Sequence, residues 1–153
     1  MAIEAPISKY KKTNLKIYIV LCIAVAAWFA YDGYINKDFI EKHTDENGKP
    51  NSTLIFNQKA PPFFAGAAVL FGVYLFVIKN KKLVADENEL VFSAKEKIPY
   101  DSIQSINKTY FDKKGFFVIT YKDEHGKEID RKISERNYDN LAAILDHLVA
   151  KIS

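Results

Sequence analysis

Two long runs of apolar residues dominate the first half of the chain. Residues 17–31 contain no ionisable side chain apart from tyrosine and Cys22, and residues 60–78 contain no charged residue. A helix rises about 1.5 Å per residue, so about 20 apolar residues cross the roughly 30 Å hydrocarbon core of a bilayer. The second run also lacks the polar stripe of a helix on the surface of a soluble protein. The pattern predicts a membrane α-helical hairpin with transmembrane helices at residues 15–35 and 61–78.

The first run has an alternative interpretation as a cleaved secretory signal. Three lysines precede its apolar core, and the Ala-Val-Ala sequence at residues 24–26 resembles a cleavage site. The apolar stretch is longer than a usual signal core, which favours a helix that is retained. Pro61 and Pro62 begin the second run, where the entrance of a helix tolerates proline.

Lysines flank the outer ends of the predicted hairpin. Cytoplasmic flanks of transmembrane helices carry an excess of Lys and Arg, so residues 1–14 and 79–153 are predicted to be cytoplasmic and residues 36–60 to form an extracytoplasmic loop. The same lysines are candidates for contact with anionic membrane lipids, although the topology rule alone explains their presence. They are Lys11, Lys12 and Lys16 before the first helix, and Lys79, Lys81 and Lys82 after the second.

Small residues recur four positions apart in both predicted helices. Ala26 and Ala30 form one such pair, and Ala68 and Gly72 form the other. This spacing lets helix backbones approach closely within a membrane. The pairs are candidates for packing one helix of the hairpin on the other, or for packing the hairpin on the helices of a partner.

The second half of the chain has short alternating runs separated by turn residues. The alternation predicts a strand at residues 116–122, flanked by strands within 103–111 and 127–134 and preceded by a β-hairpin within 83–92. Apolar positions at helical spacing from 138 to 152 predict a final amphipathic helix. The expected fold of this soluble α+β domain is an antiparallel sheet capped by a C-terminal helix.

Residues that would indicate a reaction or a cofactor are not grouped in the sequence. The three histidines have no metal-ligand spacing, and no phosphate-binding loop or nucleophile motif occurs. The predicted spans contain no ionisable group of the kind that marks transport paths or haem ligation. We therefore expect no enzymatic activity, no cofactor, no metal and no small-molecule substrate.

Charge also argues against a nucleic-acid partner. The net charge is +3, but residues 83–153 hold 11 basic and 13 acidic side chains, so the positive excess lies in the segments that flank the hairpin. A basic stripe with interleaved aromatic residues is missing from the soluble part.

The order of these segments resembles a known family. A predicted membrane hairpin is followed by LVADENELVFSAKEKIPYDSIQSI, then by the strand GFFVITY, a DEHG turn and a last helix. This resembles the bacterial pleckstrin-homology-like (PH-like) domains found behind transmembrane hairpins, in which the segment at residues 98–103 leads into the next strand. The resemblance implies a curved PH-like sheet or partial barrel of seven strands. About six strands are visible here, so the first is missing, unrecognised or replaced by the end of the membrane helix.

The resemblance also implies a setting and a class of function. It implies a bacterial inner membrane and a domain that binds proteins or lipid head groups without catalysis. Our first hypothesis is a non-catalytic, membrane-anchored interaction module that serves as an accessory subunit of a larger membrane protein complex. The alternative is a membrane-tethered sensor that binds anionic lipid head groups through its PH-like domain.

Overall fold

The computed structural model describes residues 1–153 and consists of two compact units. One unit, the hairpin unit, contains residues 13–76. The other, the sheet unit, contains residues 1–12 together with residues 77–153. The sheet unit is therefore formed by two parts of the chain that lie on either side of the hairpin in the sequence.

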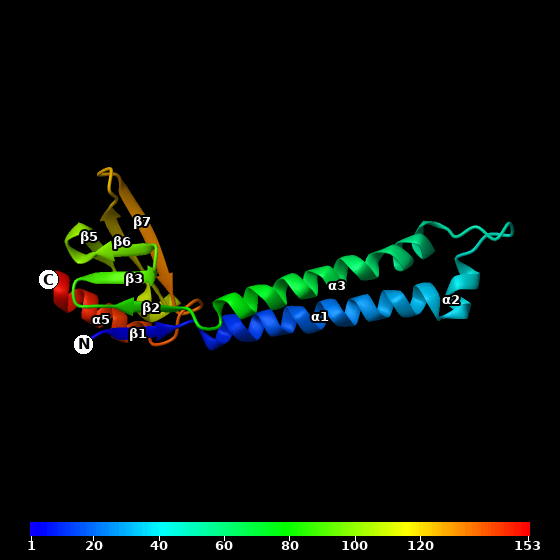
Figure 1. Ribbon diagram of the computed structural model, residues 1–153, viewed down its shortest axis with the longest axis horizontal. Coiled ribbons are helices and arrows are strands. Elements are labelled where there is room, and N and C mark those ends of the chain that lie inside the picture. The colour runs from blue at the N-terminus through cyan, green and yellow to red at the C-terminus, as the bar shows by residue number, and fades with distance from the viewer. The chain divides into compact units, whose positions relative to one another are not determined.

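The hairpin unit consists of two long helices joined through a short one (Figure 1). The long helices are α1 (Lys9–Tyr34) and α3 (Ser52–Ile78), and the short helix is α2 (Lys37–Lys42). Both long helices are apolar enough and long enough to cross a membrane, and only 11% of their most apolar windows is buried. A core helix of a soluble protein would be mostly buried. The predicted helical hairpin is therefore confirmed, with its apolar side chains exposed.

Helix α3 begins nine residues before the predicted span, so Pro61 and Pro62 lie inside the helix and not at its entrance. Asn51 explains the early start, because its side-chain oxygen accepts a hydrogen bond from the backbone N–H of Leu54 at 3.0 Å. This is the usual N-cap arrangement. The expectation that the prolines begin the helix was wrong, since the polar N-cap lies further upstream.

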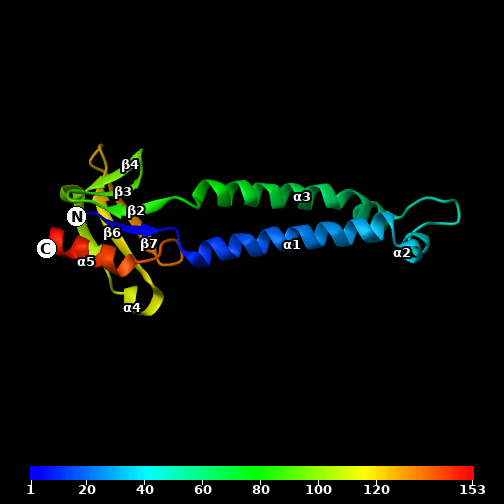
Figure 2. The ribbon, with the colours of Figure 1, turned by 60° about the horizontal axis from the view of Figure 1, so that its bottom comes forward.

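The sheet unit contains seven strands in two antiparallel sheets (Figures 1 and 2). The four-stranded sheet has the order β1-β2-β3-β4 and the three-stranded sheet has the order β5-β6-β7. The strands are β1 (Ile3–Pro6), β2 (Lys82–Ala85), β3 (Glu89–Ser93), β4 (Glu96–Pro99), β5 (Ile103–Asn107), β6 (Phe116–Lys122) and β7 (Glu128–Ser134). A 3-10 turn η1 (Tyr100–Ser102) connects β4 to β5, the single-turn helix α4 (Phe111–Lys114) connects β5 to β6, and α5 (Leu141–Ile152) follows β7.

One hydrophobic core joins both sheets to the final helix. The first sheet contributes Leu83 and Leu90, β6 contributes Phe117, and α5 contributes Ile144 and Leu148, all fully buried. Burial of one face of each sheet and one face of α5 is what the alternating and helical patterns predicted. The predicted antiparallel sheet capped by a C-terminal helix is confirmed.

Strand β1 was not recognised in the sequence. It pairs with β2 in the register Ile3↔Ala85 to Pro6↔Lys82, and Ala5 is fully buried. Four residues are too few to show a clear alternation, and the proline at the end of the segment argues against a strand. The N-terminal segment, ahead of the hairpin, therefore adds a strand to the sheet that the sequence did not reveal.

Ser8 lies between the end of β1 and the start of α1, and its hydrogen bonds stabilise this junction. It is fully buried, and its hydroxyl donates to the backbone oxygen of Arg136 at 2.5 Å and accepts from the N–H of Lys11 at 3.1 Å. The carboxylate of Asp139 accepts from the N–H of Lys9 at 3.0 Å. Two side chains therefore satisfy N–H groups in the first turn of α1, where no intrahelical partner exists.

Two predicted elements are shorter than expected. The strand expected within residues 103–111 ends at Asn107, and the final helix begins at Leu141 and not at Tyr138. Tyr138 instead forms a bridge with Ile7, and Asn140 has a left-handed backbone with φ of 60°, which a helix cannot contain.

Candidate functional site

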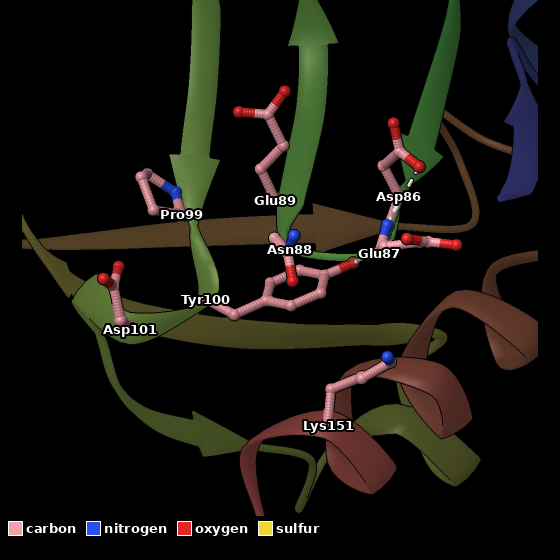
Figure 3. Close-up of a pocket in the computed structure, with 8 residues that line it drawn as sticks. All are labelled: Asp86, Glu87, Asn88, Glu89, Pro99, Tyr100, Asp101 and Lys151. Carbon is pink, nitrogen blue, oxygen red and sulfur yellow. Dashed lines mark hydrogen bonds between the residues drawn. The ribbon is translucent and has the colours of Figure 1, made fainter. Parts of the chain in front are cut away.

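An acidic pocket lies at the turn between β2 and β3 (Figure 3). The cavity measures about 730 Å³ and carries four carboxylates against one lysine. The turn supplies three of the lining residues, η1 supplies the tyrosine, and α5 supplies the lysine. The lining residues are Asp86, Glu87, Asn88, Glu89, Pro99, Tyr100, Asp101 and Lys151.

Two of the four carboxylates of the acidic pocket pair with different cationic groups. Glu89 forms an ion pair with Lys97 at 2.7 Å, and Glu87 lies 3.9 Å from the amino group of Met1. Nowhere in the chain do three His, Cys, Asp or Glu side chains group as metal ligands would. The ion pair with Glu89 also raises the pKa of Lys97, chiefly through the hydrogen bond between the two side chains.

Tyr100 is the one strongly perturbed group of this pocket. Its hydroxyl donates to the backbone oxygen of Asp86 at 2.6 Å, and its N–H donates to the backbone oxygen of Asn88 at 3.0 Å. Burial, with the nearby carboxylates of Asp86 and Glu89, raises the pKa of Tyr100 to about 12. At neutral pH the phenol is a protonated donor that holds the turn in place.

A basic pocket of about 720 Å³ lies at the opposite end of the β1–β2 pair. Its lining comes from the first turn of α1, from α4 and the start of β6, and from the end of β7. Four side chains are cationic, two are carboxylates and three are aromatic. The lining residues are Tyr10, Phe111, Asp112, Lys113, Lys114, Gly115, Phe116, Lys132, Ser134, Glu135 and Arg136.

Aromatic rings hold two of the ammonium groups of the basic pocket. Nζ of Lys132 lies 3.8 Å from the ring centroid of Phe116, and Nζ of Lys114 lies 5.0 Å from that of Tyr110. The two rings stack on each other at 5.4 Å. Gly115, with φ of 65°, ends α4 and turns the chain into β6, so these side chains meet on one surface.

A third cavity, the hairpin groove, lies between α1 and α3 and measures about 750 Å³. It contains three of the four predicted helix-packing residues, Ala26, Ala30 and Ala68. The fourth, Gly72, lies elsewhere, and a Cβ added there would meet no atom within 4 Å. The groove is lined by Ile19, Ile23, Ala26, Ala27, Ala30, Tyr34, Gln58, Pro61, Pro62, Ala65, Ala68 and Val69.

Helices α1 and α3 approach each other closely at Gly33, a residue that belongs to neither of the small-residue pairs predicted from the sequence. A Cβ at Gly33 would lie 2.9 Å from the backbone oxygen of Asn57. The hydroxyl of Tyr34 donates to the backbone oxygen of Gln58 at 2.8 Å, and the Gln58 side chain donates back to the Gly33 oxygen at 3.0 Å. Pro61 and Pro62 lack the N–H groups that would bond these two α3 carbonyls within the helix. In the sequence, Pro61 and Pro62 were the feature that could have indicated this contact between the helices.

The lysines that flank the hairpin lie in three different parts of the structure. Lys11, Lys12 and Lys16 lie in the first turns of α1, and Lys79 and Lys81 lie between α3 and β2. Lys82 belongs to β2, where its ammonium group forms an ion pair with Glu4 of β1. Lys82 therefore connects two strands.

Comparisons with protein-family models, with curated proteins and with solved structures found no match to this chain. The function is therefore inferred from the cavities, charges and helices described above.

Proposed function

We propose that this protein is a non-catalytic interaction module anchored in a membrane, and that it serves as an accessory subunit of a larger membrane protein complex. The hairpin groove carries this proposal. An anchor requires only length and apolar surface, which α1 and α3 supply without any groove. Alanines from both helices line the groove, and small residues are what let a third helix approach closely in a bilayer.

The pairing of β1 with β2 supports a hairpin that enters and leaves the membrane on one side. β1 precedes α1 and β2 follows α3, yet the two strands are hydrogen-bonded neighbours. This pairing favours a chain that returns to the side of the membrane from which it entered. The lysines next to both helices favour the cytoplasm for that side, and with the resemblance they favour the bacterial inner membrane.

The sheet unit supports a PH-like binding domain as the cytoplasmic part of the module. Seven strands divided into sheets of four and three, closed by a C-terminal helix, match what the resemblance implies. We propose that this unit covers the cytoplasmic surface of a partner while the groove receives one of the partner's helices.

Purification of the full chain from its native membrane in mild detergent, followed by mass spectrometry, tests the proposal. We expect a reproducible stoichiometric membrane partner. Ala65→Leu fills the groove, whereas Gly66→Leu places the same leucine side chain one residue away, where an added Cβ meets no atom within 4 Å. The first variant should lose the partner and the second should keep it. Recovery of a lone monomer, or equal effects of both variants, would contradict the proposal.

A further inference from the structure

We infer that the basic pocket binds a phosphate group, carried either by an anionic lipid head group or by a soluble phosphate ester. Its cations are Lys113 and Lys114 of α4, Lys132 of β7, and Arg136, which follows β7. None of the four forms an ion pair with a carboxylate. Positive charge therefore remains available to a ligand.

The two carboxylates of the lining offset only part of this charge. Glu135 packs against the turn, since a Cβ at Gly115 would lie 2.5 Å from its Oε2 atom. Asp112 belongs to the first turn of α4 and forms no ion pair. With four cationic and two anionic side chains, the lining keeps an excess of two positive charges.

The stacked pair Tyr110 and Phe116 orders the cationic surface. Lys114 and Lys132 each rest on one ring of the pair, and both lysines line the pocket. An ammonium group held in this way loses little freedom when it binds a phosphate oxygen. Arg136 adds the planar donor that suits two phosphate oxygens at once.

The size and position of the cavity fit a head group. Its volume of about 720 Å³ falls within the range of roughly 300–1,000 Å³ that small-molecule sites occupy. Tyr10 lines the pocket from the first turn of α1, five residues before Leu15, where the apolar run begins. A lipid source rests on the proposed membrane anchoring, whereas a soluble phosphate ester does not.

The acidic pocket provides an internal contrast. It has nearly the same volume and lies at the Met1 end of β1, but its charge is negative. The sheet unit is therefore polarised along β1, with its positive end where the chain leaves for α1. A phosphate ligand should distinguish the two pockets strongly.

Site-resolved lysine acetylation of the full chain in an uncharged detergent tests the inference. One arm adds inorganic phosphate and glycerol phosphate, and the other adds phosphatidylglycerol, with phosphatidylcholine as the neutral control. We expect protection of Lys114 and Lys132, while Lys151 of the acidic pocket keeps its reactivity. Protection in the first arm identifies a soluble ester, and protection by phosphatidylglycerol alone identifies a lipid head group. No protection in either arm would overturn the inference.

Two double variants that remove the same charge distinguish binding in the basic pocket from nonspecific electrostatic attraction to the protein surface. Lys132→Gln with Arg136→Gln should weaken binding of the protecting ligand about tenfold or more, since two charge-assisted contacts are lost. Lys122→Gln with Lys127→Gln removes the same charge beyond the pocket and should leave binding nearly unchanged. Equal weakening by both pairs would overturn the inference. Phosphate binding and partner purification are separate readouts, so either proposal can fail alone.

Discussion

Tyr100 lies where η1, the turn after β2 and helix α5 meet. Its hydroxyl reaches the backbone oxygen of Asp86 after β2, and Nε2 of His147 in α5 lies 3.2 Å from that same oxygen. The tyrosine is only 8% exposed. A phenolate in this position would lose its donor hydrogen and face the carboxylates of Asp86 and Glu89. Ionisation is therefore coupled to loss of the turn.

We expect the stability of the sheet unit to fall in alkali because of Tyr100. Its pKa is raised to about 12, above the unfolded value of about 10. The contribution of the neutral phenol is therefore complete below pH 10 and is lost as the pH rises through 12. Urea unfolding of the full chain in detergent, followed from pH 7 to 11, should show a steeper decline for the natural protein than for Tyr100→Phe.

At neutral pH, Tyr100→Phe measures how much the hydrogen bond between Tyr100 and Asp86 contributes to the free energy of unfolding. Tyr100→Phe should lower the free energy of unfolding by about 1 kcal/mol, the usual net contribution of one intramolecular hydrogen bond. Tyr121→Phe is the control, because Tyr121 lies in β6 and its hydroxyl forms no hydrogen bond. Equal losses in the two variants would indicate that the bond to Asp86 is not the cause.

The two long helices are in close contact at the end near α2. Gly33 has no side chain, and the two prolines of α3 leave carbonyl groups of Asn57 and Gln58 without intrahelical donors. Tyr34 supplies one donor, and the bare backbone at Gly33 admits the other carbonyl. Phe29 packs edge-on against Phe56 with centroids 5.4 Å apart, which continues the contact along α1.

Substitution of Gly33 should separate the two helices at this end. Gly33→Ala places a Cβ 2.9 Å from a backbone oxygen, and overpacking of this kind costs about 1–3 kcal/mol. Gly66→Ala adds the same methyl group to α3 where no atom lies within 4 Å, so it should be neutral or slightly stabilising. Thermal unfolding of the full chain in detergent measures both, and a tolerated Gly33→Ala would contradict close packing at this site.

Elements with a sustained period could be predicted from the sequence, and short or interrupted ones could not. Fifteen or more apolar residues in succession revealed α1 and α3, and strict alternation revealed β6 as the central strand of its sheet. β1 has four residues and ends on a proline, so no local signal identified it. Its pairing depends on a partner 76 positions away, which only the fold brings near.

The cavities could not be predicted because each gathers residues from separate segments. The basic pocket combines Tyr10 with residues 111–116 and 132–136, and no sequence window contains its charge. The lysines next to the hairpin were visible as a run, yet Lys82 is used to pair strands. The alanines of the groove were found by their spacing, whereas Gly33 follows no such spacing.

At the scale of the whole molecule, the hairpin is an insertion into a β-hairpin. Pro6 and Lys82 are paired, and the N–H of Ile7 donates to the oxygen of Lys81 at 3.1 Å, so the excursion through α1 and α3 begins and ends at adjacent points. Removal of the insertion leaves two neighbouring chain ends that a short loop can join. The sheet unit has its own core, which includes no residue of the hairpin unit.

We expect residues 1–8 joined to residues 80–153 through a four-residue glycine-rich loop to fold as a soluble monomer. The comparison is the fragment 80–153 alone, which lacks the fully buried Ala5 and leaves the edge of β2 unpaired. An unpaired edge promotes aggregation. Size-exclusion chromatography and amide hydrogen exchange distinguish the two, and equal behaviour of both chains would show that β1 is dispensable.

The distance between β1 and its partner has a consequence for biogenesis. During translation the first strand is complete 76 residues before β2 begins, which is roughly 4–15 s at about 5–20 residues per second. In that interval the ribosome delivers both helices of the hairpin. Under the proposed membrane anchoring, a chain in which only one of the two helices crosses the bilayer holds β1 and β2 on opposite sides of the membrane. In such a chain the edge of β2 stays open and the core lacks Ala5, so closure of the sheet depends on correct integration of the whole hairpin.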